Sequence, residues 1–482
     1  MPKSHGVGYQ LKSGQLGAGE IAFMVVAAAS PLGAIFVGVG ASLSLGNGVG
    51  TPGVYLIASI VLMLFAVGFV AMSRHIKNAG AFYAYITAGL GKRLGYAAAI
   101  IALVSYNFYV VAITVFFGIF TEEAVKNSFD LEVSWEIWSV AGLALLAVLS
   151  SRKIQVGAWV LIILLLAEVV ILTLLSGSIL IQCGWDAFSF ASFSPEVIFS
   201  GSVGVSIVYA FSSFTGFEAT AIYAEEARDP ERTVPRATFL ALFFIAVFYV
   251  FTIWAIISGF DDNGAVEAAR ADPEGFVFDL NSAFVGNFTT TIMGILLSTS
   301  LFAALLAFHN ATSRYIFALA RDGALPQILS KTRAVSGSPF IASAVQLIFS
   351  ALVLGVSIMI GVDAIADLAP GLLGVGALGI LTLQAMASFA VIGYFRSRPN
   401  QSVWTTKIAP LLSGISLVVA TFLAVFHFEE LTQAKSSFFN NLWVLIPISI
   451  LLGLIIAKNK EGKNDKAHRN FGMGGEPIKD IE

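Results

Sequence analysis

Long apolar runs separated by short polar segments recur along the whole chain of 482 residues. A helix needs about 20 mostly apolar residues to cross the roughly 30 Å hydrocarbon core of a bilayer. Runs of this length exclude a membrane β-barrel, whose strands take about 10 residues with alternating polarity. The pattern therefore predicts an all-α membrane protein, and twelve transmembrane helices can be delimited along it.

The predicted helices form two groups of six. In the first half they cover Glu20 to Leu45, Val54 to Ala71, Leu94 to Phe120, Trp135 to Leu149, Val156 to Leu180 and Val197 to Ala224. In the second half they cover Thr238 to Gly259, Thr289 to Ala318, Ile341 to Gly361, Leu368 to Tyr394, Ile408 to Phe426 and Phe439 to Ala457.

Composition and charge placement agree with this reading. Charged residues make up 12% of the chain, against roughly 25% in a soluble domain. With both termini in the cytoplasm, all of the 27 Lys and Arg except Lys126, Arg270 and Lys435 lie on the cytoplasmic side, where such residues normally concentrate. We therefore expect a multi-pass protein of the plasma or inner membrane, with a cytoplasmic segment at residues 1–19 and a disordered cytoplasmic tail at residues 458–482.

Two predicted helices contain helix-breaking sequence near their middle. The first reads Ala29-Ser30-Pro31-Leu32-Gly33-Ala34, in which proline lacks an N–H and clashes with the preceding turn. The sixth reads Ser212-Ser213-Phe214-Thr215-Gly216-Phe217-Glu218. Non-helical backbone at this depth is tolerated only where it is buried in protein or lines a wet cavity. Both segments are therefore candidate binding sites.

A simpler interpretation applies to each break alone: Pro31 kinks a continuous helix, and the serines bond their own backbone. The positions of the pair favour a site, because breaks in the first and sixth helices match a five-plus-five inverted repeat whose broken helices meet at the bilayer midplane. In that arrangement the freed N–H groups face an anionic group and the freed carbonyls face a cation.

Several motifs resemble those of the amino acid-polyamine-organocation permease superfamily over roughly residues 15 to 400. They are Gly216-Phe217-Glu218, Glu225-Glu226, Asp229-Pro230 and Pro235-Arg236, with Asn78-Ala79-Gly80-Ala81-Phe82-Tyr83-Ala84-Tyr85, Ser313-Arg314-Tyr315, Arg321-Asp322-Gly323-Ala324-Leu325-Pro326 and Gly337-Ser338-Pro339. The resemblance implies a LeuT-type fold and transport by alternating access. It places the first repeat at residues 20–180, the second at residues 197–394 and two peripheral helices at residues 408–457.

The resemblance also implies where a substrate binds. In such carriers the unwound parts of the first and sixth helices hold the substrate, and the third helix contributes to the site. Carried over to this sequence, the substrate-binding residues are Ala29, Ser30, Pro31, Leu32, Gly33, Ala34, Tyr106, Asn107, Phe211, Ser212, Ser213, Phe214, Thr215 and Gly216.

The chain departs from many relatives in ways that bear on the substrate. Pro31 removes a donor that a substrate carboxylate could have used, which leaves room for amines such as ethanolamine or a polyamine beside ordinary amino acids. Ser212 stands where an aromatic gate is common. The fifth helix has no mid-helix lysine of the kind that replaces a sodium ion in some relatives, and it carries Glu168 instead.

Glu218 and Glu168 are the candidate proton-coupling residues. An ionised carboxylate at mid-bilayer is costly, so both should face the protein interior and exchange protons, although a permanently neutral, hydrogen-bonded carboxyl is the alternative for each. Ser298, Thr299 and Ser300 are the residue types of a sodium site, but we expect a proton rather than sodium as the coupling ion. His309 is interpreted as a packing residue.

The function expected from these features is secondary transport of an amino acid or related amine. Exchange of one substrate for another is an alternative, and a non-transporting sensor on the same fold belongs to a different class. We expect no enzyme activity, because metal-binding, phosphate-binding and nucleophile motifs are missing and Cys183 is the only cysteine. We also expect no cofactor, no metal site and no nucleic-acid partner; the lipid bilayer is the expected surrounding.

Overall fold

The computed structural model describes residues 14, 16–76, 78–150, 155–260, 262–333, 337–398, 401–432, 436–462 and 471–472. Across this part of the chain the structure is helical, with an isolated backbone bridge between Leu16 and Ala227 and no extended strand. Eleven helical segments are long and apolar enough to cross a membrane. The all-α membrane fold is confirmed. The fourth predicted helix is present as α7 (Trp135–Ser150), but with 16 residues it falls short of that criterion, so the count of twelve is not reached.

The helices of the first half begin with an interrupted span. Their bounds are α1 Ala18–Ala29, α2 Pro31–Gly33, the π-helical turn η1 Ala34–Val39, α3 Gly40–Ser44, η2 Gly48–Gly50, α4 Thr51–Ser73, α5 Phe82–Leu90, α6 Lys92–Phe129, α7 Trp135–Ser150, α8 Gln155–Cys183, η3 Trp185–Ala187 and η4 Phe190–Phe193. Pro31 is the first residue of α2, where its missing N–H removes no helical bond.

The second half also begins with an interrupted span. Its helices are α9 Pro195–Ile198, α10 Val203–Phe214, α11 Ala219–Ile222, η5 Tyr223–Glu225, α12 Pro230–Phe260, α13 Asp262–Ala271, α14 Phe276–Phe284, α15 Asn287–Arg321, η6 Gln327–Ser330, α16 Phe340–Met359, η7 Ala364–Leu368, α17 Ala369–Phe395, η8 Trp404–Ile408, α18 Ala409–Phe426, α19 Phe428–Thr432, α20 Ser437–Asn440, η9 Leu442–Val444 and α21 Leu445–Gly462.

Several predicted boundaries differ clearly from the structure: α6 ends at Phe129 rather than at Phe120, and α12 starts at Pro230 rather than at Thr238. The sixth span starts at Val203 rather than at residue 197, because Pro195 opens the separate short helix α9. At the end of the chain, α21 continues to Gly462, so residues 458–462 are helical rather than disordered. Phe471 is fully buried, which also contradicts disorder at that position. Residues 463–470 and 473–482 of the predicted tail, and residues 1–13 and 15 of the N-terminal segment, lie outside the described residues.

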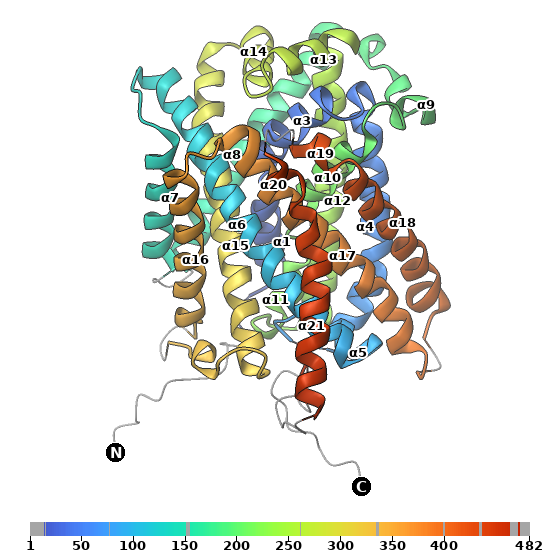
Figure 1. Ribbon diagram of the computed structural model, residues 1–482. Coiled ribbons are helices and arrows are strands. Elements are labelled where there is room, and N and C mark those ends of the chain that lie inside the picture. The colour runs from blue at the N-terminus through green and yellow to red at the C-terminus, as the bar shows by residue number, and fades with distance from the viewer. Residues whose placement is uncertain are drawn as a thin grey trace.

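The helices form one bundle with two distinct ends (Figure 1). Helices α9, α13 and α14 gather at one end, and α5 lies at the opposite end; these are called the α14 end and the α5 end below. Inside the bundle α6 packs against α15, α17 and α21, while α1 packs against α12 and α15. Burial identifies the interior: 94% of an apolar 18-residue stretch within Val203–Glu225 is buried, against 28% of the corresponding stretch within Phe340–Met359. The broken sixth span is thus enclosed by other helices rather than by lipid.

Candidate functional site

The first transmembrane span is broken at Ser30. This residue has a left-handed backbone conformation (φ 49°), which non-glycine residues seldom adopt. Its N–H donates to the Ala27 carbonyl at 3.1 Å, and its carbonyl accepts from the N–H of Ala34 at 2.7 Å. The helix therefore ends at Ala29 and restarts at Pro31. The break predicted from the sequence is confirmed.

The sixth span is broken between Phe214 and Ala219. Thr215 is extended, and Gly216 has a φ of 115°, a conformation open almost only to glycine. The freed N–H of Gly216 donates to Oε2 of Glu218 at 3.0 Å. This break is confirmed as well, and the carboxylate two residues further on satisfies one of its backbone donors.

The two breaks lie against each other. A Cβ added to Gly216 would sit 2.9 Å from the Cβ of Ala28, at the end of α1. Beside this contact lies a cavity of about 10 Å³, large enough for at most about one water. It is lined by Met24, Ala28, Tyr106, Gly216, Glu218, Ala219, Tyr223, Ala307, Phe308 and Ala311. The first, third, sixth and eighth spans thus meet at one small cavity, which is closed in this structure.

Glu218 supplies the charge-bearing group of this cavity. Its side chain is fully buried, and its Oε1 accepts a hydrogen bond from the hydroxyl of Tyr106 on α6 at 2.8 Å. The other wall residues are apolar apart from the two tyrosines. A carboxylate held in this way can bind an ammonium group or take up a proton.

Glu168 forms a second polar centre beside the first break. Its Oε2 accepts from the hydroxyl of Ser300 at 2.5 Å and, more weakly, from the N–H of Leu32 at 3.5 Å. Ser300 also shares a hydrogen bond of 2.8 Å with the hydroxyl of Ser30. One chain of contacts therefore links α8, α15 and the break. Glu168 stands at the restarted helix, where an anionic group is favoured.

The remaining predicted site residues around the breaks are buried, and two of them accept hydrogen bonds from neighbouring helices. The Ala29 carbonyl accepts from the Tyr249 hydroxyl at 3.0 Å, and the Ser212 carbonyl accepts from the Tyr109 hydroxyl at 3.0 Å. Five others pack inside the core without lining the cavity: Pro31, Gly33, Ala34, Phe211 and Phe214. The hydroxyls of Ser213 and Thr215 donate to carbonyls of their own helix.

Of the predicted substrate-binding residues, Tyr106 and Gly216 line the cavity, and Asn107 lies away from both the cavity and the breaks. Its amide donates to the carbonyl of Leu103 on its own helix at 2.7 Å, and it does not line the cavity. Its neighbour Tyr106 reaches Glu218. Consecutive residues of a helix point in different directions, and here Tyr106 faces the cavity whereas Asn107 does not.

Three tyrosines that surround the breaks were missed by sequence reasoning. Tyr109 and Tyr249 donate to carbonyls next to the breaks, and Tyr55 shares a hydrogen bond of 2.9 Å with Ser213. A tyrosine in an apolar helix carries no signal that its hydroxyl will meet a broken helix far away in the sequence. Ser300 did carry a signal, as a hydroxyl within a transmembrane helix.

The Tyr249→Phe variant is expected to be less stable than wild type by about 1 to 3 kcal/mol, because it leaves the buried Ala29 carbonyl without its donor. Tyr55→Phe is the matched control and should cost less, since Ser213 keeps its bond to the Tyr209 carbonyl. Thermal unfolding of both purified variants measures the difference. Equal melting temperatures would show that the Tyr249 bond does not hold the break.

The α5 end of the site is closed by an ion-pair cluster, formed by Arg314, Arg321, Glu225, Glu226 and Asp322. The guanidinium of Arg314 bonds both carboxylate oxygens of Glu226, at 2.5 and 3.1 Å. Arg321 bonds both oxygens of Glu225 at 2.9 Å. These contacts join the end of the eighth span to the end of the sixth, so an ionic closure is present at this end of the bundle.

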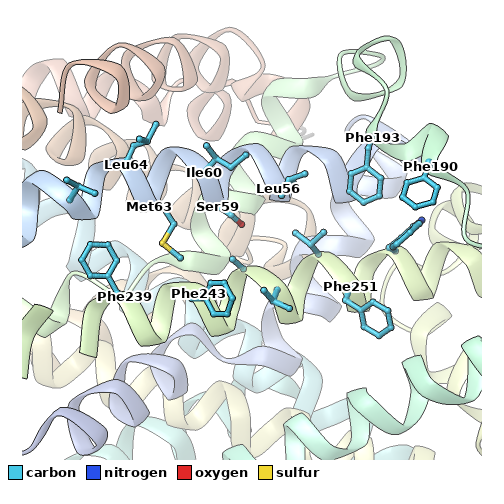
Figure 2. Close-up of a pocket in the computed structure, with 15 residues that line it drawn as sticks. Leu56, Ser59, Ile60, Met63, Leu64, Phe190, Phe193, Phe239, Phe243 and Phe251 are labelled. Carbon is cyan, nitrogen blue, oxygen red and sulfur yellow. The ribbon is translucent and has the colours of Figure 1, made fainter. Parts of the chain in front are cut away.

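A larger hollow lies elsewhere on the molecule. It is a groove of about 790 Å³ between α4 and α12, shown in Figure 2. Its walls are almost entirely apolar, and the hydroxyl of Ser59 in its lining is bonded to the Tyr55 carbonyl. Many of the lining side chains are exposed on the outside of the bundle, including Ile60 and Phe243. The groove offers no group for a polar substrate and is not a candidate for the functional site.

Across the described residues, no group of three or more His, Cys, Asp or Glu side chains is placed to hold a metal ion. His309 contacts Gln346 at 2.5 Å and Ser343 at 2.8 Å on the neighbouring helix α16. Both of its ring nitrogens are therefore engaged within the protein, as expected of a packing residue.

Comparison with known proteins finds relatives that are named as permeases or importers of amino acids and amines. The lysine-specific permease LysP of Lactococcus lactis subsp. cremoris is 37% identical over 147 residues, covering 30% of this chain and 28% of LysP. The low-affinity putrescine importer PlaP of Escherichia coli is 25% identical over 291 residues, covering 57% of this chain and 60% of PlaP. The branched-chain amino acid permease BcaP of Lactococcus lactis subsp. cremoris is 25% identical over 303 residues, covering 59% and 64%.

Each of these alignments spans less than two thirds of the relative's length. The match to a family model is far more extensive: the model described as amino acid permease covers residues 18–456. That range includes both broken spans, the cavity and the ion-pair cluster. The chain therefore belongs to the amino acid permease family, within the amino acid-polyamine-organocation superfamily.

Proposed function

We propose that the protein is a secondary transporter that moves an amino acid or related amine across the membrane by alternating access. One observation carries this proposal: the buried carboxylate of Glu218 lies in a cavity at the break of the sixth span, against the part of the first span that directly precedes its own break. Broken helices at the centre of a bundle form binding sites in transporters built from repeats. Opening the cavity first at one end of the bundle and then at the other gives the solute a path.

The contacts at the first break favour a substrate that carries an ammonium group and needs no carboxylate. Pro31 has no N–H to offer, and the N–H of Leu32 already faces Glu168. Glu218 provides a negative partner for an ammonium group. The named relatives include transporters of lysine, putrescine and branched-chain amino acids. We therefore rank amines and cationic amino acids first, with exchange of two such substrates as the alternative mode.

A proton is the proposed coupling ion. Glu218 is the first candidate to carry it, because a substrate ammonium group and a proton would compete for the same carboxylate, and Glu168 is the second. Sodium is less well supported: the hydroxyls of Ser298 and Thr299 donate to their own helix, and Ser300 donates to Glu168.

The α5 end is proposed to face the cytoplasm of a plasma or inner membrane. It carries the arginines of the ion-pair cluster, together with Arg93 and Lys460, and positive charge concentrates on the cytoplasmic side of membrane proteins. The acidic segments α13 and α14 lie at the opposite end.

The experiment that tests the function is uptake into liposomes containing the purified protein. Labelled putrescine, lysine and leucine are offered with an inward proton gradient, an inward sodium gradient or no gradient. We expect accumulation of at least one amine or cationic amino acid, stimulated by the proton gradient alone. Binding of a solute without uptake or exchange would instead make the protein a sensor, and stimulation by sodium alone would contradict proton coupling.

Two variants then separate the roles of the carboxyl groups. Glu218→Gln is expected to weaken binding and exchange, because an amide carries no charge for the ammonium group. Glu168→Gln is expected to retain exchange in either case. It should keep gradient-driven accumulation if Glu218 carries the proton, and lose that accumulation if Glu168 carries it. The rates are measured from about pH 5.5 to 8 in the same liposomes. A wild-type pH profile in both variants would show that neither group carries the coupling proton.

A further inference from the structure

Phe471, near the end of the chain, fills a pocket at the α5 end. Its ring is fully buried and stacks on Tyr96 of α6, with 3.8 Å between ring centroids and 8° between planes. On another side it stacks on Tyr83 of α5, at 5.3 Å and 28°. Two tyrosine faces therefore hold one phenylalanine, an arrangement that adds ring stacking to the burial of apolar surface.

Gly472 is held in the same pocket through its backbone. Its N–H donates to Oδ2 of Asp322 at 3.0 Å, and its carbonyl accepts from the amide of Asn78 at 3.2 Å. Its φ of 82° favours glycine, and an added Cβ would lie 2.9 Å from a methyl carbon of Thr87. The pocket formed by Asn78, Tyr83, Thr87, Tyr96 and Asp322, called the aromatic pocket below, thus selects an aromatic residue followed by glycine.

The aromatic pocket shares residues with the ion-pair cluster. Asp322 accepts from Gly472 and from the Tyr83 hydroxyl, and its other oxygen lies 3.6 Å from Nε of Arg321. Asn78 contacts Gly472 through its amide nitrogen and Arg321 through its oxygen, at 3.3 Å. The residues that bind the tail therefore also position the arginine that closes the α5 end.

The sixth span is tied to this same group of residues. Glu225, at the end of η5, accepts from Arg321 and from the backbone N–H of Ala79 at 2.8 Å. If the sixth span moves outward to open the α5 end, both contacts must break. Phe471-Gly472 supports the contact between Arg321 and Glu225, because Gly472 holds Asn78 and Asp322, which both contact Arg321.

We propose that the aromatic pocket is a binding site for the chain's own Phe471-Gly472 segment, and that its occupation latches the α5 end closed. A ligand that binds one conformation better than another shifts the population toward it by its difference in affinity. The tail is covalently attached, with its preceding helix anchored by Lys460 to the carbonyl of Gly323 beside the pocket. Its effective concentration is therefore high, and the latch closes without a partner. The proposal rests on the alternating opening of the two ends, and not on any particular substrate.

The test measures access to the cavity from the α5 end. In a Cys183→Ser background, an Ala219→Cys reporter places a thiol on the cavity wall. A membrane-impermeant maleimide is added on the α5 side of membrane vesicles. We expect Phe471→Ala to raise the labelling rate roughly threefold to tenfold, as the loss of a stacked aromatic contact favours the open form. Phe438→Ala, which removes an exposed phenylalanine at the α14 end, is the matched control and should leave the rate unchanged.

A second measurement keeps the test independent of any single variant. In a chain shortened to end after Gly462, the Ala219→Cys reporter should be labelled faster than in the full chain. A synthetic peptide of residues 466–477 should lower that labelling rate again. The same peptide with alanine at position 471 should not. If the point variant and the shortened chain label at the wild-type rate, or if both peptides act alike, the latch does not exist. Because labelling involves no transported solute, a failure here is distinct from a failure of the proposed transport activity.

Discussion

Gly216→Ala is expected to reduce transport by at least about tenfold. At a φ of 115° an alanine is strained by about 1 to 3 kcal/mol, and its Cβ would lie 2.9 Å from that of Ala28. Relief of the clash would push the first and sixth spans apart at the point where they form the cavity. Initial rates of uptake or exchange in liposomes measure the effect.

Gly355→Ala provides the matched control. This glycine lies within α16, and a Cβ added there meets nothing within 4 Å. Alanine favours a helix more than glycine does, so the control should transport normally and be at least as stable as wild type. Should Gly216→Ala also transport at the wild-type rate, the close approach of the two breaks would have no part in the mechanism.

Arg314→Met is expected to destabilise the protein by about 3 to 5 kcal/mol, because it strands the carboxylate of Glu226 without its partner. The side chains of this pair are only 3% and 11% exposed. The double variant Arg314→Met, Glu226→Met should recover a large part of the loss, since it removes both charges. Thermal unfolding of the purified variants tests both expectations.

The pair between Arg93 and Glu461 serves as the control for this experiment. Its hydrogen bonds are as short, at 2.8 to 3.1 Å, but the side chains are 68% and 33% exposed. Solvent screens such pairs, so Arg93→Met should change the melting temperature little. A loss for Arg93→Met as large as that for Arg314→Met would mean that burial does not govern these contacts.

The breaks could be predicted from the sequence because their causes are local. Pro31 cannot continue the helix that precedes it without loss, and Gly216 with the hydroxyl residues near it disfavours a helix. These properties belong to the residues themselves and hold whatever surrounds them. Both breaks consequently appear where the sequence indicates them, at Ser30 and at Thr215 to Glu218.

The partners of the breaks could not be predicted in the same way. Glu168 and Ser300 are separated by 132 positions, and the hydroxyl of Tyr249 reaches Ala29 across 220. Such contacts depend on how the helices are rotated about their axes. Sequence periodicity defines that rotation poorly here, because helices in the middle of a membrane bundle are apolar on all sides. Asn107 illustrates the difficulty, as one helical position separates it from the cavity-facing Tyr106.

The C-terminal tail shows a different limit of prediction from sequence composition. Its charged and glycine-rich composition is typical of segments that cannot bury enough apolar surface to fold. That argument concerns averages over many residues, whereas Phe471 is one residue that enters a preformed pocket. Composition does not reveal a docking motif of two residues when the complementary surface is built from helices far away in the sequence.

The π-helical turn from Ala34 to Val39 winds the first span with one surplus residue just beyond its break. Such a surplus can migrate along a helix by exchanging hydrogen bonds one at a time, and each step rotates the following stretch about its axis. The stretch Gly40–Ser44 can consequently rotate about the helix axis relative to Ala18–Ala29, while both stretches stay helical. The first span thus contains a point of rotation directly after its break.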